Sequence, residues 1–263
     1  YAPAAFQVSG KRIIGAELDD EWGDPLWNGA LGAVYQLSER LSLYSHATAG
    51  ILEAPPGAVT TQGKALENET RIMLDAGIQW DQPDLGTAKF GGFYVFRDSA
   101  LLIENTYVDA GGDEFTAYEN RDVRQYGLEV EMRSVPIRDV ASVYATATVM
   151  DSRQREDGAY ENRIELPDII LTGGVYTEWQ AFDCNIFGKY VSGYENKRFA
   201  ADKQSHDLGD FVDLNVTVGY AFGEDEQTRV FVSLENLLDD EYATVVGYPD
   251  EGFQAFVGLQ HRL

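Results

Sequence analysis

The sequence predicts an all-β fold whose antiparallel strands form a transmembrane β-barrel. Three observations lead to this expectation. Apolar and polar residues alternate along many segments, no apolar run approaches the roughly 18 residues of a membrane-spanning helix, and the connections between segments alternate between short and long. With 263 residues and no stretch that resembles a linker, the chain is expected to form one domain.

The alternation is clearest near the end of the sequence. From Phe253 to Leu263 the odd-numbered positions are mostly apolar and the even-numbered ones mostly polar, and residues 212–222, 126–133 and 71–80 behave alike. Successive side chains of a strand point to opposite faces, so each segment would have one apolar and one polar face. A soluble sandwich can alternate in the same way, and the pattern alone therefore indicates strands, not a membrane.

Marking each alternating segment gives roughly twelve strands, which lies within the even-numbered range of outer-membrane barrels. The expected strands are residues 8–18, 29–37, 40–51, 69–81, 87–105, 116–134, 140–151, 168–181, 183–195, 210–223, 228–238 and 253–263.

The connections between these strands fall into two sets. The short ones are residues 37–40, 82–86, 135–139, 181–183 and 223–227. The long ones are residues 19–28, 52–68, 106–115, 152–167, 195–209 and 239–252. Outer-membrane barrels have short periplasmic turns and long extracellular loops, and by this count both chain ends lie on the periplasmic side. Aromatic residues near the strand ends are candidates for interfacial girdles: Trp22, Trp27, Trp80, Trp179, Tyr190, Tyr194, Tyr242 and Phe253.

Composition excludes several classes of protein. A formal net charge of −24 argues against nucleic acid as a partner, because a polyanion requires a basic face. The single cysteine, Cys184, excludes an internal disulfide framework and a multi-thiolate metal site, and its phase with Ile186 places it on an apolar face. No initiator methionine or signal peptide precedes Tyr1, which is therefore expected to be a processed or truncated start.

Short motifs follow one another along the chain. Leu66-Glu-Asn-Glu69 precedes Asp75-Ala-Gly77, and Glu119-Asn120 precedes Tyr126-Gly-Leu-Glu129. The longest begins at Val232 and reads Val-Ser-Leu-Glu-Asn-Leu-Leu-Asp-Asp-Glu-Tyr, with Gly-Tyr-Pro at 247–249, Gly252 and Val-Gly-Leu at 257–259 behind it. In this order, after the segment 35–44, they resemble the C-terminal half of a TonB-dependent outer-membrane receptor of the siderophore type. The chain departs from that pattern at Asn68 (proline in the family), Asp75 (glutamate), Phe253 (often arginine) and Leu263 (usually aromatic).

The resemblance implies that residues 1–263 are the C-terminal portion of a larger barrel. The full receptor would have a plugged lumen and 22 strands, whereas this chain supplies about half the strands and no plug domain or partner-binding box. Twelve strands of so wide a cylinder leave two unpaired edges, which hydrocarbon does not tolerate. The remaining strands are expected from the same longer chain or from a partner chain.

The function that the resemblance implies is uptake of a scarce ligand across the bacterial outer membrane, most of all a ferric siderophore. The partners would be outer-membrane lipid, the small-molecule ligand and a TonB-type energy-coupling complex reached through the plug. A passive porin-like barrel is the alternative. An outer-membrane enzyme is less favoured, since none of His46, His206 and His261 lies in a recognisable nucleophile motif.

Candidate ligand contacts are aromatic and basic residues of the long loops, because cationic groups attract anionic chelates and tyrosine adds a flat face with a hydroxyl. They are Tyr160, Arg163, Lys197, Arg198, Phe199 and Tyr248. No catalytic residue, resident metal site or cofactor is expected. The acidic clusters Asp19, Asp20, Glu21, Asp24 and Asp109, Asp113, Glu114 lack ordered calcium-loop spacing, so we interpret them as solvated loops.

Overall fold

The computed structural model describes residues 5–8, 11–14, 26–55, 60, 66–108, 114–163, 165–196, 204–223 and 227–262. Within these ranges every regular element is a β-strand. No helix in the described part of the chain is long and apolar enough to cross a membrane. The expected all-β, antiparallel fold is confirmed.

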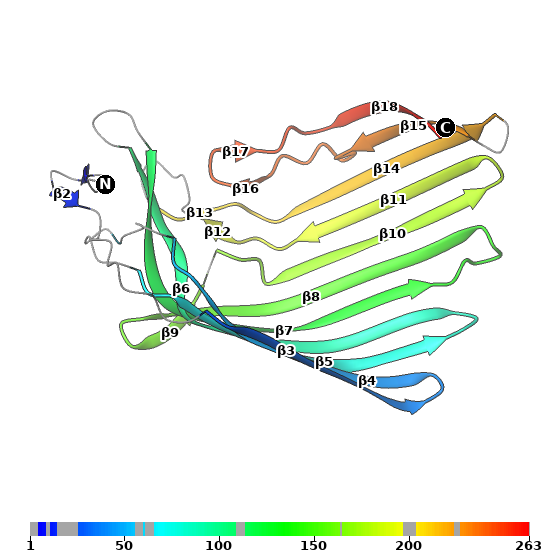
Figure 1. Ribbon diagram of the computed structural model, residues 1–263. Helices are drawn as coiled ribbons and strands as arrows, with labels where there is room; N and C mark the ends of the chain where they lie inside the picture. Colours follow the sequence, from blue (N-terminus) through cyan, green and yellow to red (C-terminus); the bar gives the residue numbers. More distant parts are fainter. Residues whose placement is uncertain are drawn as a thin grey trace.

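One large antiparallel sheet contains most of the strands (Figure 1). Its main path runs through eleven strands in the order β18-β15-β14-β11-β10-β8-β7-β6-β5-β4-β3. Their bounds are β3 Asn28–Ser38, β4 Leu41–Leu52, β5 Glu69–Gln82, β6 Gly86–Val108, β7 Glu114–Ser134, β8 Ala141–Glu156, β10 Ile169–Trp179, β11 Phe182–Val191, β14 Phe211–Phe222, β15 Thr228–Glu235 and β18 Gln254–His261. Among the described residues the path is open, since β3 and β18 end it without pairing to each other.

Seven short strands complete the described structure. β9 (Ala159–Asn162) pairs with the end of β8 and is the twelfth strand of the large sheet. The other six form separate two-stranded hairpins: β1 (Ala5–Val8) with β2 (Lys11–Ile14), β12 (Glu195–Asn196) with β13 (His206–Asp207), and β16 (Ala243–Val245) with β17 (Tyr248–Pro249).

The eleven main strands follow the last eleven predicted ranges closely, but the first predicted strand, residues 8–18, is wrong where the structure describes it. Val8 pairs with Lys11, so the chain turns back on itself in a hairpin outside the large sheet. This hairpin lies at the long-loop end of the wall in Figure 1, and residues 1–4, which carry the expected N-terminal chain end, lie outside the described residues. Alternation with period two identifies a strand but not its partner, which explains the error.

Strand β15 also ends earlier than predicted. Residues 236–238 were expected to continue the strand, yet Asn236 adopts a positive φ of 47° and closes it. Asparagine accepts this left-handed conformation more readily than most residues because its short polar side chain can bond locally.

One face of the sheet is apolar across its whole width. Cross-strand partners on this face match in register from strand to strand, for example Leu43, Ile78, Phe90 and Val130 on β4 to β7, and Val218, Val232 and Val257 on β14, β15 and β18. Leu128 and Val257 are 53% and 78% exposed, so this face is unburied by the described residues. On β5 the apolar face extends from Ile72 to Trp80, a length that suits the 9–11 residues of a membrane-spanning strand.

Aromatic residues mark the edges of this apolar face. Trp179, Phe182 and Tyr220 are adjacent across β10, β11 and β14 at the short-turn end, and Tyr94 pairs with Tyr126 toward the long loops. Two of the predicted girdle residues lie elsewhere, because Tyr194 donates a hydrogen bond to Thr244 O and Tyr242 stacks on Phe211. Trp22 lies outside the described residues.

The opposite face is polar and carries aromatic rings over glycines. Four aromatic residues pair directly across strands with a glycine on this face: Tyr44 with Gly77, Phe93 with Gly127, Tyr144 with Gly174, and Phe231 with Gly258. In each pair the ring atoms or hydroxyl occupy the space where a Cβ of the glycine would lie. Glycine is therefore required at these positions by the close approach of the ring and, at Gly77, Gly127 and Gly174, of a backbone oxygen on a neighbouring strand as well.

The wall is tallest at β6 and β7, which continue beyond their neighbours as a two-stranded extension at the long-loop end (Figure 1). The register between them shifts between Arg97 and Ala100, where Asp98 and Ser99 form a bulge. Ala100, Leu102 and Val123 pack together there into a small buried apolar cluster. The strands at this point are thus held by side chains of their own in addition to the ladder of backbone hydrogen bonds.

Candidate functional site

A fully buried carboxylate lies where the apolar face of β5 ends and the long loops begin. Glu69, the first residue of β5, has no exposed side-chain surface and lies on the polar face of the sheet. A buried charge is tolerated only when it is paired and hydrogen-bonded. Its neighbours show how this is achieved.

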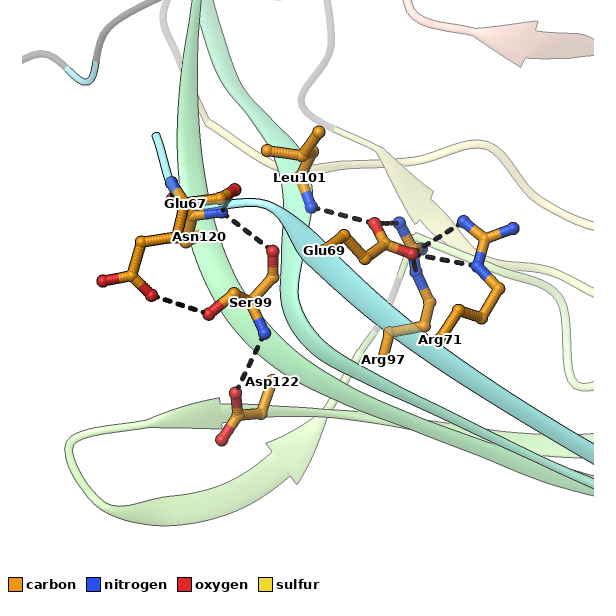
Figure 2. A network of polar contacts seen from close by, with 8 residues as sticks. All are labelled: Glu67, Glu69, Arg71, Arg97, Ser99, Leu101, Asn120 and Asp122. Carbon is orange, nitrogen blue, oxygen red and sulfur yellow. Dashed lines mark hydrogen bonds and ion pairs between the residues drawn. The ribbon is translucent and has the colours of Figure 1, made fainter. Parts of the chain in front are cut away.

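Two arginines and one backbone amide hold the carboxylate (Figure 2). Arg97 on β6 donates from Nε to Oε1 at 2.8 Å and from Nη2 to Oε2 at 2.7 Å. Arg71 donates from Nε and Nη2 to Oε1 at 2.9 and 2.7 Å, and the backbone N–H of Leu101 donates to Oε2 at 3.2 Å. Arg71 and Arg97 are cross-strand partners, so the register of β5 and β6 places both guanidinium groups against the same acid.

These donors keep Glu69 ionised. Burial by itself would raise the pKa of the carboxyl, but the hydrogen bonds from Arg97, Arg71 and Leu101 outweigh it and lower the pKa from 4.5 to about 2. Glu69 lies beyond the apolar span of β5, on the side of the long loops. The cluster of Glu69, Arg71 and Arg97 is hereafter called the arginine pair site.

A second set of hydrogen bonds fixes the bulge beside the arginine pair site. The Asn120 side chain accepts from Glu67 N at 2.8 Å and donates to Glu67 O and Ser99 O, while Ser99 Oγ donates to Glu67 Oε2 at 2.9 Å (Figure 2). Ser99 N donates to Asp122, which allows Ser99 its positive φ of 53°. The motif residues Glu69 and Asn120 therefore join the start of β5 to the bulge of β6.

Asn68 replaces the proline of the family pattern, and the structure gives it a task. Its Oδ1 accepts a hydrogen bond from the backbone N–H of Ala54 at 3.0 Å. This bond ties the two stems of the long connection between β4 and β5 together. The substitution replaces a rigid residue with a side-chain bond across the connection.

The closing motif builds a different cluster, at the end of β15. Asn236 is buried. Its side chain accepts a hydrogen bond from Asp240 N and donates one to Asp240 O, both at 3.0 Å, and its backbone N–H donates to Asn215 Oδ1 at 3.0 Å. Asp240 and Asp239 in turn accept from the backbone N–H groups of Val212 and Phe253. This asparagine cluster anchors the last loop to β14 and β18 with almost no charge pairing.

Tyr242 of the same motif stacks on Phe211, with ring centroids 3.9 Å apart and planes within 3°. Burial of the phenol, followed by its hydrogen bond to Asp250, raises the pKa of Tyr242 to about 12. The hydroxyl therefore stays protonated at all physiological pH values. The tyrosine serves to pack the loop against β14.

The three predicted ligand contacts that the structure describes, Tyr160, Arg163 and Tyr248, have separate partners and surroundings. Tyr160 on β9 lies 3.9 Å beneath the guanidinium of Arg124, measured to the ring centroid. Arg163 is only 13% exposed and pairs with Glu165 at 3.2 Å, yet its Nε has no hydrogen-bond partner among the described residues. Tyr248 is 63% exposed on the separate hairpin β16–β17.

The remaining predicted positions lie outside the described residues. These are Lys197, Arg198 and Phe199, together with Asp19, Asp20, Glu21, Asp24, Asp109 and Asp113. Within the described ranges, no group of three or more histidine, cysteine or acidic side chains is arranged to hold a metal ion. The ligand contacts expected in the loops thus remain predictions.

The family model described as TonB dependent receptor-like, beta-barrel matches residues 10–237. The chain belongs to this family. The match covers all but a few of the strands and includes both the arginine pair site and Asn236. A comparison with the sequences of curated proteins finds no match.

Solved structures of similar fold include proteins described as transporters or receptors. The copper transporter OprC has a TM-score of 0.74 at 15% identity, over 95% of this chain and 42% of that one. The ferripyoverdine receptor of Pseudomonas aeruginosa has 0.69 at 15%, over 88% and 32%, and the ferric citrate transporter FecA has 0.66 at 19%, over 89% and 38%. The chain spans about a third of the length of the structures it matches.

Sequence reasoning quoted Glu69 and Asn120 as family motifs but assigned neither a role, and it overlooked Arg71 and Arg97. The alternation did indicate these two residues, because each arginine occupies a polar-face position of its strand, β5 or β6, close to where the apolar face ends. Their meeting on Glu69 depends on the register between the strands, which the sequence does not provide.

Proposed function

We propose that the protein is an outer-membrane receptor that imports a metal chelate, most of all a ferric siderophore, by energised transport. Residues 1–263 would form the C-terminal part of its barrel, with the apolar face toward lipid and the polar face toward the interior. The observation that carries the proposal is the family match across residues 10–237. Similar folds described as ferripyoverdine and ferric citrate proteins support an iron chelate as the cargo.

The partners follow from the same proposal. The sheet is open at β3 and β18, so further strands, from the same longer chain or from a partner, would complete the barrel. A plug domain would fill the interior and contact a TonB-type energy-coupling complex. Loop residues Tyr160, Arg163, Lys197, Arg198, Phe199 and Tyr248 remain proposed ligand contacts at the cell surface.

Uptake by cells tests this function directly. A strain that lacks the gene, grown under iron limitation, is expected to lose uptake of radiolabelled ferric chelate from a panel of siderophores, and the intact gene is expected to restore it. Restored uptake should vanish when the proton-motive force is collapsed, because transport by such receptors is energised. Restoration of copper uptake alone would move the cargo from iron to copper.

Conductance of the protein in planar bilayers separates the receptor from a passive porin. A receptor with a filled interior is expected to show little open-channel current. A steady conductance of the complete protein would contradict the receptor proposal and favour a porin-like barrel.

A further inference from the structure

The arginine pair site has one positive charge in excess. Arg71 and Arg97 contribute two charges and the buried Glu69 neutralises one, in a chain whose formal net charge is −24. Because Glu69 is fully buried and stays ionised, it orients the two guanidinium groups and leaves their excess charge unneutralised. The site therefore attracts anions, in contrast to the acidic chain as a whole.

The two arginines differ in how much of each is available. The Arg97 side chain is 17% exposed, and its guanidinium binds both carboxylate oxygens of Glu69 in a bidentate contact. Arg71 is 42% exposed and binds a single oxygen through Nε and Nη2. Its third nitrogen points away from the carboxylate in Figure 2 and donates to none of the described residues. Arg71 is therefore the member that can accept a further anionic partner.

A pocket of about 320 Å³ lies directly against Arg71. Asn28, Thr48 and Gly50 line it with Arg71, and the pairing of Asn28 with Gly50 and of Gly50 with Arg71 places them on the polar face at the long-loop end. Asn28 and Thr48 contribute an amide and a hydroxyl to the lining of the same pocket, which is otherwise largely apolar, and Gly50 lets Asn28 pack closely because a Cβ there would meet Asn28 Cβ at 2.9 Å. A guanidinium with neutral donors beside it suits a carboxylate or phosphate.

The acidic side chains around the arginine pair site have other partners, since Glu67 and Asp122 bind Ser99 at the bulge of β6. Glu119 and Glu156 bind Arg121 on β7, at 2.9 and 3.0 Å, whereas the pocket lies on β3, β4 and β5. No carboxylate lines the pocket itself. The acidic surroundings thus stop short of Arg71.

We propose that Arg71, oriented by Glu69 and assisted by Asn28 and Thr48, binds one carboxylate or phosphate group of an anionic ligand on the polar face of the wall. The inference rests on the proposed receptor function and narrows its cargo to chelates that carry a free anionic group. It adds a wall residue to the loop residues that the sequence suggests.

The test uses the complete encoded protein purified in detergent, with sodium citrate and inorganic phosphate as separate probes in titration calorimetry. The wild-type protein is expected to bind at least one of them at a single saturable site. Arg71→Gln should weaken that binding about tenfold or more, since a charge-assisted hydrogen bond is lost. The stronger probe then identifies the group as carboxylate or phosphate.

Arg133→Gln is the matched control, because Arg133 lies on the same face of β7 at the short-turn end. It should bind like the wild type. Arg71→Lys retains the charge and should recover part of the affinity. Folding of each variant is checked by its heat-modifiable mobility on a gel, and Arg97 still satisfies both oxygens of Glu69 when Arg71 is replaced.

Absence of saturable binding of either probe to the wild type, or equal binding by Arg71→Gln and wild type, would overturn the anion site. Chelate uptake by cells is measured in parallel. If cells with the wild-type gene take up chelate although the protein binds neither probe, only this site is refuted. If the wild-type gene does not restore uptake to the strain that lacks it, the receptor function itself is refuted.

Discussion

The arginine pair site and the asparagine cluster both lie at the long-loop end of the same sheet, yet they are built in opposite ways. The first joins three strand residues through full charges on a buried carboxylate. The second folds residues 236–253 back on themselves through a neutral amide and backbone groups, with Asp240 reaching β14. The first relies on full charges, whereas the second relies mainly on an amide side chain and backbone groups, although each includes a bond between residues 28 positions apart.

This difference separates what each cluster can do. The asparagine cluster uses its hydrogen bonds to join the loop to itself and to β14, so its role is to hold the loop in place. In the arginine pair site the two guanidinium groups neutralise Glu69 and leave one positive charge over. The asparagine cluster is therefore suited to a structural role, and the arginine pair site to binding.

Glu69→Gln is expected to have the largest effect. The change leaves two arginines facing a neutral amide, and breaking a buried ion pair by removal of one partner costs about 3–5 kcal/mol. Urea unfolding in lipid vesicles, followed by tryptophan fluorescence, measures the loss. A loss below about 1 kcal/mol would mean that the arginines find other partners and that the buried acid matters little.

Asn236→Ala should cost somewhat less, about 3 kcal/mol, because it removes three side-chain hydrogen bonds, two to Asp240 and one to Asp250, and because alanine tolerates the positive φ at this position poorly. The effect should be local. Proteolysis is expected to cut the loop 237–252 first, whereas Glu69→Gln should loosen the stems of several loops. Equal protease patterns for the two variants would contradict the division into a local and a long-range cluster.

Acid should weaken the arginine pair site selectively. The pKa of Glu69 is lowered from 4.5 to about 2, so its stabilising contribution is complete above about pH 4.5 and is lost as the pH falls toward 2. We expect the stability difference between wild type and Glu69→Gln to shrink by about 2 kcal/mol over that range. The difference for Asn236→Ala should change far less, because the amide does not titrate; unfolding curves at pH 7, 4.5 and 3 compare the two.

Gly77→Ala should give the smallest loss, about 1–2 kcal/mol. A Cβ at Gly77 would clash with Phe90 O and would lie 2.6 Å from the Tyr44 hydroxyl and 2.7 Å from Gly91 Cα, so the backbone must shift as well as the ring. Gly188→Ala is the control, since the nearest atom there is Leu214 Cδ1 at 3.8 Å. The control should stay within about 0.5 kcal/mol of wild type, and a similar loss in both would show that the close contacts at Gly77 are not the cause.

Alternation along the sequence was enough to predict eleven of the main strands, because a strand with one apolar face repeats every two residues whatever its partner. It failed for residues 8–18, where the same pattern serves a hairpin. It also did not predict β9, which pairs with β8 inside the long connection expected at residues 152–167.

The two clusters show the same limit at the level of single residues. Asn236 and Asp240 are four positions apart, and the motif that contains them could be recognised by its spacing. Glu69 lies 28 positions from Arg97 and 32 from Leu101, and only the register of β5 with β6 joins them. Arg163, a proposed ligand contact, has a pairing with Glu165 that the sequence did not predict.

The aromatic rings of the polar face have a consequence for movement through the barrel. Tyr44, Phe93, Tyr144 and Phe231 each cover a glycine of the next strand, so the ring fills a hollow in the wall instead of projecting from it. In a closed barrel, such rings would take up thickness of the wall and leave the bore free of bulky obstacles. A smooth lining of this kind would let a solid domain shift or partly withdraw without having to pass side chains that stand in its path.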